Sequence, residues 1–268
     1  MALLPLHKYF VFNDEIRPNE AFVPAENEGG IYEVLRVVNG IPLFLEDHLE
    51  RFYHSAQLAG ITIRFSEVDV YLFLKALIKK NGIQEGNILI SCKTNLKAFF
   101  ITHSYPTSEM YRDGVVCGVL KAERENPNAK VFQTTVRQQA NRMIEEKGLY
   151  EVLLVDHFDW ITEGSRSNVF FVRGNELVTP PGNQVLLGIT RQKTLQLANV
   201  LQIQLFEQVI NFSDLVDFDA AFITGTSPKI LPIRQIDGFI FNPDNKIVRL
   251  MMESYDDLID SYLNHCKK

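Results

Sequence analysis

An acidic side chain stands between two apolar segments in "WITEGSRSNVFFV", residues 160–172. Both flanking segments have the composition of buried strands, whereas Glu163 is followed by a run of small and polar residues. A carboxylate at such a point lies either at a hydrated hairpin tip or against a polar group inside the protein, because a buried charge needs a partner. Glu163 is therefore a candidate for pairing with a buried cation.

Lys130 is a second candidate for chemistry. It ends the loop "NPNAK" just before a helix that the apolar spacing predicts over residues 131–147. A positive charge at a helix start opposes the helix dipole, and both the dipole and burial favour the neutral amine. A neutral lysine amine is a nucleophile toward carbonyl groups. A surface lysine in a loop is the more common explanation of the same position.

Two further segments have the composition of an anion-binding site. In "LLGITR" (186–191) the N–H groups of Ile189 and Thr190 open a predicted helix, and helix N-termini bind phosphate or carboxylate groups. In "TGTS" (224–227) backbone amides and hydroxyls follow an apolar strand. An ordinary threonine N-cap and a tight turn would explain the same residues.

Arg51 lies on a helix predicted over residues 45–59, one turn from His48, where the usual expectation is a solvated face with ion pairs along the helix. Taken together, however, these features describe one ligand. A lysine could form a Schiff base, and a carboxylate could pair with a protonated ring nitrogen. An arginine, a helix start and a hydroxyl-rich turn could bind a phosphate dianion. These are the groups that a pyridoxal phosphate site needs.

The composition is that of a globular cytoplasmic protein. The formal net charge of −6 argues against a nucleic-acid partner, which would select clustered Lys and Arg. No apolar run is long enough to cross a bilayer, and the first residues lack the pattern of a signal peptide. Three widely spaced cysteines and six scattered histidines indicate a reducing compartment and no metal site.

The apolar patterns predict an α+β fold of two domains, residues 1–112 and 113–268, each a largely antiparallel sheet with packed helices. The segment "YPTSEMYRDG" (105–114) contains proline, serine and glycine and is the candidate boundary. A short strand is predicted at "ITIRF" (61–65). The absence of GxGxxG after the first strand, and of GxxxxGK[ST] anywhere, argues against a doubly wound nucleotide-binding fold.

The order of these motifs resembles the fold-type IV pyridoxal-phosphate enzymes over nearly the whole chain. That group contains branched-chain aminotransferases, D-amino acid aminotransferases and 4-amino-4-deoxychorismate lyases. "YEVLRVVNGIPLFLEDHLERFYHSA" (32–56) is similar to the first signature of the family, and "ITEGSRSNVFFV" (161–172) to its most specific one. The resemblance implies that residues 113–268 form the domain that binds pyridoxal 5'-phosphate.

The resemblance also implies roles for individual residues. Lys130 falls at the position of the Schiff-base lysine, and 163 − 130 = 33 residues separate it from Glu163, close to the family's interval. Glu163 would contact the pyridine nitrogen and keep it protonated. The phosphate would be held by Arg51, Ile189, Thr190 and Thr226. Ser167 and Asn168 would line the cofactor cavity or secure the turn, and Tyr32 and Ser227 would face the substrate. The role of Arg166 stays open between a substrate carboxylate, a neighbouring subunit and solvent.

The resemblance predicts a class IV aminotransferase, an enzyme that transfers an amino group between an amino acid and a 2-oxo acid. One departure matters, because the family's substrate-binding arginine has no counterpart between Arg64 and Arg112. Two alternatives therefore stay open: a lyase that forms p-aminobenzoate and pyruvate, and a cofactor-binding homologue without turnover. Family members are usually homodimers.

Overall fold

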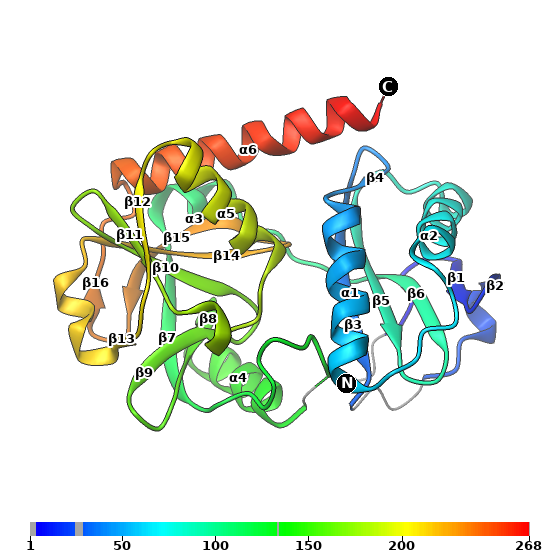
Figure 1. Cartoon of the computed structure of the whole chain (residues 1–268), viewed down its shortest axis with the longest axis horizontal. Helices are drawn as coiled ribbons and strands as arrows, with labels where there is room; N and C mark the ends of the chain where they lie inside the picture. Colours follow the sequence, from blue (N-terminus) through cyan, green and yellow to red (C-terminus); the bar gives the residue numbers. More distant parts are fainter. Residues whose placement is uncertain (1–3, 25–28, 133, 268) are drawn as a thin grey trace. The chain divides into compact units, whose positions relative to one another are not determined.

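The computed structural model describes residues 4–24, 29–132 and 134–267. The chain forms two compact units (Figure 1). The first unit contains Met1–Ser104, Ala129–Gln133 and Ser261–Lys268, and the second contains Tyr105–Asn128 and Thr134–Asp260.

The first unit is built on a six-stranded sheet in which each pair of neighbouring strands runs antiparallel. In order across the sheet, the strands are β2 (Glu15–Pro18), β1 (Tyr9–Phe12), β6 (Leu96–Ile101), β5 (Gly86–Cys92), β3 (Ile31–Val38) and β4 (Ile41–Pro42). A short 3-10 turn, η1 (Asn19–Ala21), follows β2. Helices α1 (Leu45–Ala59) and α2 (Glu67–Asn81) share one hydrophobic core with this sheet (Figure 1).

Local sequence signals explain where these helices begin and end. The Ser66 hydroxyl accepts a hydrogen bond from the N–H of Asp69, and the N–H of Ser66 donates to the Asp69 carboxylate, which forms a capping box at the start of α2. Gly60 and Gly82 follow the two helices with φ near +65°, a conformation that glycine adopts without strain. In β3 buried and half-buried residues alternate, as expected for a strand with one face on the core.

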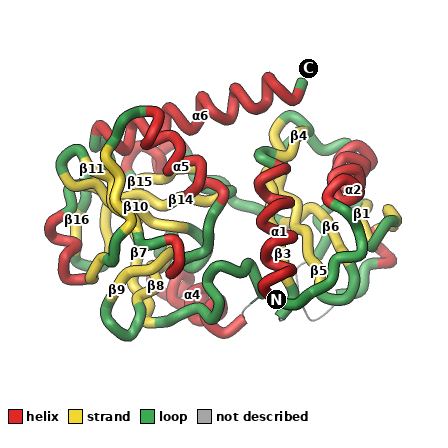
Figure 2. Tube along the Cα trace, viewed as in Figure 1, coloured by secondary structure: helices red, strands yellow, loops and turns green. Residues whose placement is uncertain are grey.

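The second unit is built on a ten-stranded sheet of mixed direction (yellow strands in Figure 2). In order, the strands are β12 (Gln204–Glu207), β11 (Glu176–Thr179), β10 (Asn168–Arg173), β14 (Ala220–Gly225), β15 (Lys229–Ile236), β7 (Val115–Lys121), β8 (Glu151–Val155), β9 (Trp160–Gly164) and β13 (Ile210–Asn211), with β16 (Phe239–Ile240) on β15. The pairs β11–β12, β15–β7 and β7–β8 are parallel, and the other pairs are antiparallel.

Four helices and two 3-10 turns complete the second unit. They are α3 (Ser108–Asp113), α4 (Thr134–Lys147), η2 (Gly182–Gln184), α5 (Ile189–Val200), η3 (Phe212–Asp217) and α6 (Lys246–Cys266), whose last residues belong to the first unit. Because β10 runs antiparallel to β14 with Asn168 opposite Thr224, the turn before β10 and the turn after β14 lie at the same edge of the sheet. Two of the sequence motifs therefore meet at this edge.

Two predictions of secondary structure are wrong in detail. Residues 61–65 do not form a strand. The helix predicted over 131–147 begins only at Thr134. Along the chain, the first compact unit gives way to the second at Ser104/Tyr105, and the segment with Lys130 belongs to the first unit. The predicted domains 1–112 and 113–268 stay a prediction. No helix within the described residues is long and apolar enough to span a membrane.

Candidate active site

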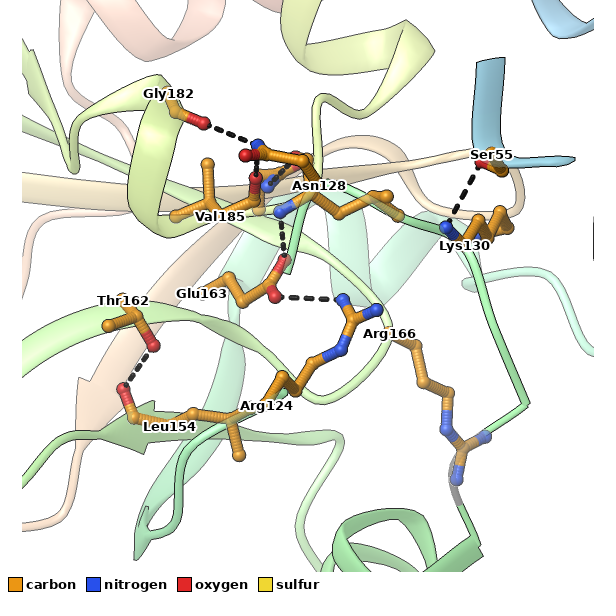
Figure 3. A network of polar contacts seen from close by, with 12 residues as sticks. Ser55, Arg124, Asn128, Lys130, Leu154, Thr162, Glu163, Arg166, Gly182 and Val185 are labelled. Carbon is orange, nitrogen blue, oxygen red and sulfur yellow. Dashed lines mark hydrogen bonds and ion pairs between the residues drawn. The ribbon is translucent and has the colours of Figure 1, made fainter. Parts of the chain in front are cut away.

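Lys130 lies in an extended segment of the first unit, next to β3. Its carbonyl accepts the N–H of Tyr32 at 3.0 Å, and its own N–H donates to Ser55 Oγ at 3.1 Å (Figure 3). Its Nζ lies 4.9 Å from the ring centroid of Tyr32, a cation–π distance, and Phe132 stacks on the same tyrosine at 4.2 Å. Lys130 does not lie at a helix start as predicted, because it precedes the first residue of α4 by four positions.

Arg51 does not lie on a solvated face of α1. Its side chain is buried and forms two hydrogen bonds with Glu33, from Nε to Oε1 and from Nη2 to Oε2, both at 2.7 Å. His48 Nδ1 lies 2.8 Å from Glu33 Oε2. The paired geometry fixes the arginine, which a single contact would leave free to rotate.

The sequence carried a signal for Glu33 that our prediction missed. In β3, Glu33 lies on the same face of the strand as Ile31, Leu35 and Val37, all of which are buried. A carboxylate on the apolar face of a strand needs a buried partner. The helix with Arg51 and His48 supplies two.

The environment of Glu33 shifts two ionisation equilibria. Burial alone raises the pKa of Glu33, but the charge of Arg51 and hydrogen bonds from His48 and Arg51 outweigh burial, so that pKa lies well below its usual range. Burial lowers the pKa of His48, and the charges of Arg51 and Lys130 act in the same direction against the opposing effect of Glu33. The folded protein thus favours an ionised Glu33 and a neutral His48.

Glu163 is a buried acid of the second unit and is bound on both carboxylate oxygens. Arg124 Nη1 donates to Oε1 at 2.9 Å, and the N–H of Leu186 donates to Oε2 at 3.0 Å (Figure 3). The guanidinium offsets the cost of burying the carboxylate charge. Glu163 is therefore not at a hydrated hairpin tip, and Arg124 was missed because nothing in its loop sequence indicates a buried partner.

The loop between Gly182 and Gly188 leads to the start of α5 and is held from two sides. Asn128 Nδ2 donates to the carbonyls of Gly182 and Val185 at 2.8 and 2.9 Å (Figure 3). Asn168 Nδ2 donates to the carbonyl of Leu186 at 2.8 Å. Both asparagines thus fix the backbone that precedes the helix.

The backbone N–H groups at the N-terminus of α5 have no side-chain cap. Its N-cap is Gly188, which supplies no side-chain hydrogen bond to the first turn, where Ile189 and Thr190 lie. A Cβ on Gly188 would lie 2.2 Å from Asn168 Oδ1, so glycine is required by this close approach rather than by its φ of −60°. A helix start without a side-chain cap suits an anion.

The turn between β9 and β10 is organised by a further buried acid, Glu151. Ser165 Oγ and Ser167 Oγ donate to it at 2.6 and 3.0 Å, and the N–H of Arg166 donates at 3.2 Å. These bonds favour the interpretation in which Ser167 secures the turn. The side chain of Arg166 points away from Glu163 (Figure 3). Its Nη2 donates to Asn141 Oδ1 in α4.

Thr226 and Ser227 lie in the three-residue turn that joins β14 to β15. Tyr111 fastens this turn by donating to the carbonyl of Pro228 at 3.1 Å. At the end of β14 the buried Oγ1 of Thr224 has no hydrogen-bond partner within the described part of the chain. Thr224 pairs with Asn168 across the two strands, so this hydroxyl belongs to the same edge of the sheet.

The predicted residues thus fall into two groups, one in each unit. The first unit contains Tyr32, Arg51 and Lys130. The second unit brings together the edge of the sheet and the start of α5, with Glu163, Ser167, Asn168, Ile189, Thr190, Thr226 and Ser227.

A family model described as amino-transferase class IV matches residues 30–236. A D-alanine aminotransferase of Bacillus licheniformis is 29% identical over 253 residues, which are 82% of this chain and 85% of that protein. The branched-chain amino acid aminotransferase of Escherichia coli has a similar structure, with a TM-score of 0.85 at 20% identity over 94% of this chain and 95% of that one. A putative 4-amino-4-deoxychorismate lyase of Legionella pneumophila has a TM-score of 0.78 at 20% identity over 89% and 97% of the two chains.

The chain belongs to the class IV aminotransferase family. The predicted family, the α+β fold and the assignment as an enzyme are confirmed. The residues present fit the family's cofactor, pyridoxal phosphate. The start of α5 lacks a side-chain cap, a buried hydroxyl of Thr224 lacks a partner among the described residues, and Glu163 offers a buried negative charge.

We expect Gly188→Ala to lower the free energy of unfolding by about 1–3 kcal/mol, because the new methyl group overlaps Asn168 Oδ1. Gly238→Ala is the matched control, because a Cβ there meets no atom within 4 Å and the change stays within about 0.5 kcal/mol. Urea unfolding measures both. In the Asn168→Ala background the cost of Gly188→Ala should fall, and equal costs in the two backgrounds would contradict the close approach.

We expect the stability of the protein to fall as the pH drops below 6.5, the ordinary value for histidine, and to fall more steeply below 4.5, the ordinary value for glutamate. The unfolded chain binds a proton at His48 first and at Glu33 later, whereas the folded chain resists both protonations, so stability is fully present above these values. Urea midpoints measured at a series of pH values test this.

In the variant His48→Gln, stability should depend less on pH between 6.5 and 4.5, the ordinary pKa values of histidine and glutamate. His54→Gln, an exposed imidazole on the same helix, controls for the loss of a ring from α1. A wild-type slope between these two pH values that survives in His48→Gln would show that another group is responsible.

Proposed function

We propose that this chain is a pyridoxal-phosphate-dependent aminotransferase that moves an amino group between an amino acid and a 2-oxo acid. One observation carries the proposal: the N–H of Leu186 binds the buried carboxylate of Glu163, two residues before the N-cap of α5. A site for a ring cation and a site for a phosphate are thereby joined by one hydrogen bond. Pyridoxal phosphate is a ligand with these two groups at fixed separation.

The cofactor supplies, when bound, a protonated ring that withdraws electrons from the substrate's α-carbon and so weakens its bond to hydrogen. The residues of the second unit would hold it. Glu163 would keep the ring nitrogen protonated, because a nearby carboxylate stabilises the cation. The backbone N–H groups of Ile189 and Thr190, together with Thr226, would bind the phosphate. Asn168 would act indirectly, because its amide already holds the loop before α5.

The residues of the first unit would supply the reactive amine and further charge. Lys130 would attach the cofactor through Nζ and then carry the proton removed from the substrate's α-carbon. Its contact with the face of Tyr32 holds the amine near an aromatic ring. Arg51, held rigidly by Glu33, would complete the phosphate site, and Tyr32 and Ser227 would face the substrate.

The substrate is an amino acid in this proposal, and a D-alanine aminotransferase and a branched-chain aminotransferase among the similar proteins support this class. The lyase alternative keeps one supporting observation, the lack of an arginine between Arg64 and Arg112. A homodimer in the cytoplasm is the assembly and location that we propose with the aminotransferase activity. A measurement of molecular mass in solution tests the dimer.

We expect borohydride reduction of the purified protein to fix a pyridoxyl group on Lys130, because this reagent traps the covalent link between the amine and the cofactor aldehyde. Peptide mapping by mass spectrometry locates the modified residue. Lys130→Ala should lose the label and at least about 10³-fold of the turnover, since it removes both the attachment point and the proton carrier. Lys121→Ala is the matched control, because Lys121 is exposed and pairs with Asp159 at the surface. A pyridoxyl group on another lysine would overturn the assignment.

A single assay separates the activities. We expect release of 2-oxo acid from an amino acid to stop after about one equivalent per active site unless a second 2-oxo acid is present as acceptor, because the amino group must pass on before the next cycle. Formation of pyruvate and p-aminobenzoate from 4-amino-4-deoxychorismate without any acceptor would establish the lyase instead. Cofactor binding without turnover of either kind would support a non-catalytic homologue.

A further inference from the structure

The C-terminal helix α6 reaches the proposed phosphate site through one side chain, Tyr255. This tyrosine is 4% exposed, and its hydroxyl donates to Thr190 Oγ1 at 3.3 Å. Both residues belong to the second unit, and Thr190 itself is 4% exposed. A hydroxyl pair is thus buried at the first turn of α5, the turn whose N-cap offers no side-chain bond.

Apart from the hydroxyl oxygen of Tyr255, no acceptor for the proton of the Thr190 hydroxyl is found among the residues that the structure describes. Threonine in a helix usually donates to a carbonyl three or four residues earlier. Here the carbonyl of Leu186 already accepts from Asn168 Nδ2 and from the N–H of Gly188, and the carbonyl of Leu187 accepts from Gln192 Nε2. Within the described chain, the contact with Tyr255 is the one hydrogen bond found for Thr190 Oγ1.

We propose that Tyr255 is a positioning residue for the cofactor phosphate and that it acts through Thr190. The inference rests on the proposed function. By donating to Thr190 Oγ1, the tyrosine occupies the acceptor side of that hydroxyl. The single proton of Thr190 then points to a different acceptor, a phosphate oxygen at the start of α5.

The length of the contact is consistent with this role. Hydroxyl pairs lie about 2.7–2.8 Å apart, so 3.3 Å is long. Hydrogen bonds in a chain polarise one another, so an anion that accepts the proton of Thr190 makes Oγ1 a better acceptor for Tyr255. The contact therefore tightens with the phosphate in place. The hydroxyl of Tyr255 should therefore affect binding of the phosphate group and not binding of the ligand's ring.

The test compares two ligands that differ only in the phosphate. Apo-protein is prepared from the full chain, and dissociation constants are measured for pyridoxal phosphate and for pyridoxal. Tyr255→Phe should weaken pyridoxal phosphate about three- to tenfold, the usual effect of one neutral hydrogen bond, and leave pyridoxal unchanged. Inorganic phosphate should likewise become a weaker competitor in the variant.

Three variants guard against a general loss of folding. Tyr262→Phe removes a hydroxyl from the same helix, where it bonds to Leu45 and Glu46 rather than to Thr190, and should leave the ratio of the two affinities unchanged. Thr190→Ser keeps the hydroxyl and should retain the effect of Tyr255→Phe. Thr190→Val removes the hydroxyl that Tyr255 would position, so adding Tyr255→Phe should cause no further loss of affinity for pyridoxal phosphate.

The outcomes are distinct. Equal weakening of pyridoxal and pyridoxal phosphate in Tyr255→Phe, or no weakening of either, would overturn the role of Tyr255 while the proposed function stands. A wild-type chain that binds no pyridoxal phosphate would overturn the proposed function itself, whatever the variants do.

Discussion

The hydrogen bond between Leu186 and Glu163 is the contact on which the second unit's site depends. A buried carboxylate is stable only when its charge is balanced and its oxygens are bound, and Arg124 and the loop backbone meet these needs. The same bond fixes the loop that ends at the N-cap of α5. One interaction therefore satisfies a buried charge and also sets the distance from that charge to the helix start that we propose as part of the phosphate site.

Buried acids have a similar structural function elsewhere in the described chain. Glu33 ties the strand β3 to Arg51 and His48 of α1, so a strand and a helix of the first unit are fixed by one ion pair. Glu151 has no cation among its bonds in the described residues and is satisfied by hydroxyl and N–H groups of the turn at 165–167 and by the N–H of Val152. In each case an acid inside the protein holds a segment that carries predicted functional residues.

Short-range signals made much of the fold predictable. Ser66 and Gly82 define α2 because capping and left-handed turns depend on neighbouring residues alone. The two strands on either side of the polar run after Glu163 were equally clear, because short apolar segments bounded by polar residues are typical of buried strands. The start of α4 was misplaced because residues 130–132 pair with residues 29–32, which are far away along the chain, and no local pattern reveals such a pairing.

For the candidate site, the sequence by itself determined which groups are present: an amine, an acid in an apolar setting, an arginine, and two segments rich in N–H and hydroxyl groups. These follow from residue type and local spacing. Only the tertiary structure decided what each group touches. It paired Arg51 with Glu33 and Glu163 with Arg124, made Asn168 a support for the loop before α5, and brought Tyr255 to Thr190. These partners are separated by 18 to 65 residues along the chain, and the contacts arise only when sheet register and helix packing bring distant side chains together.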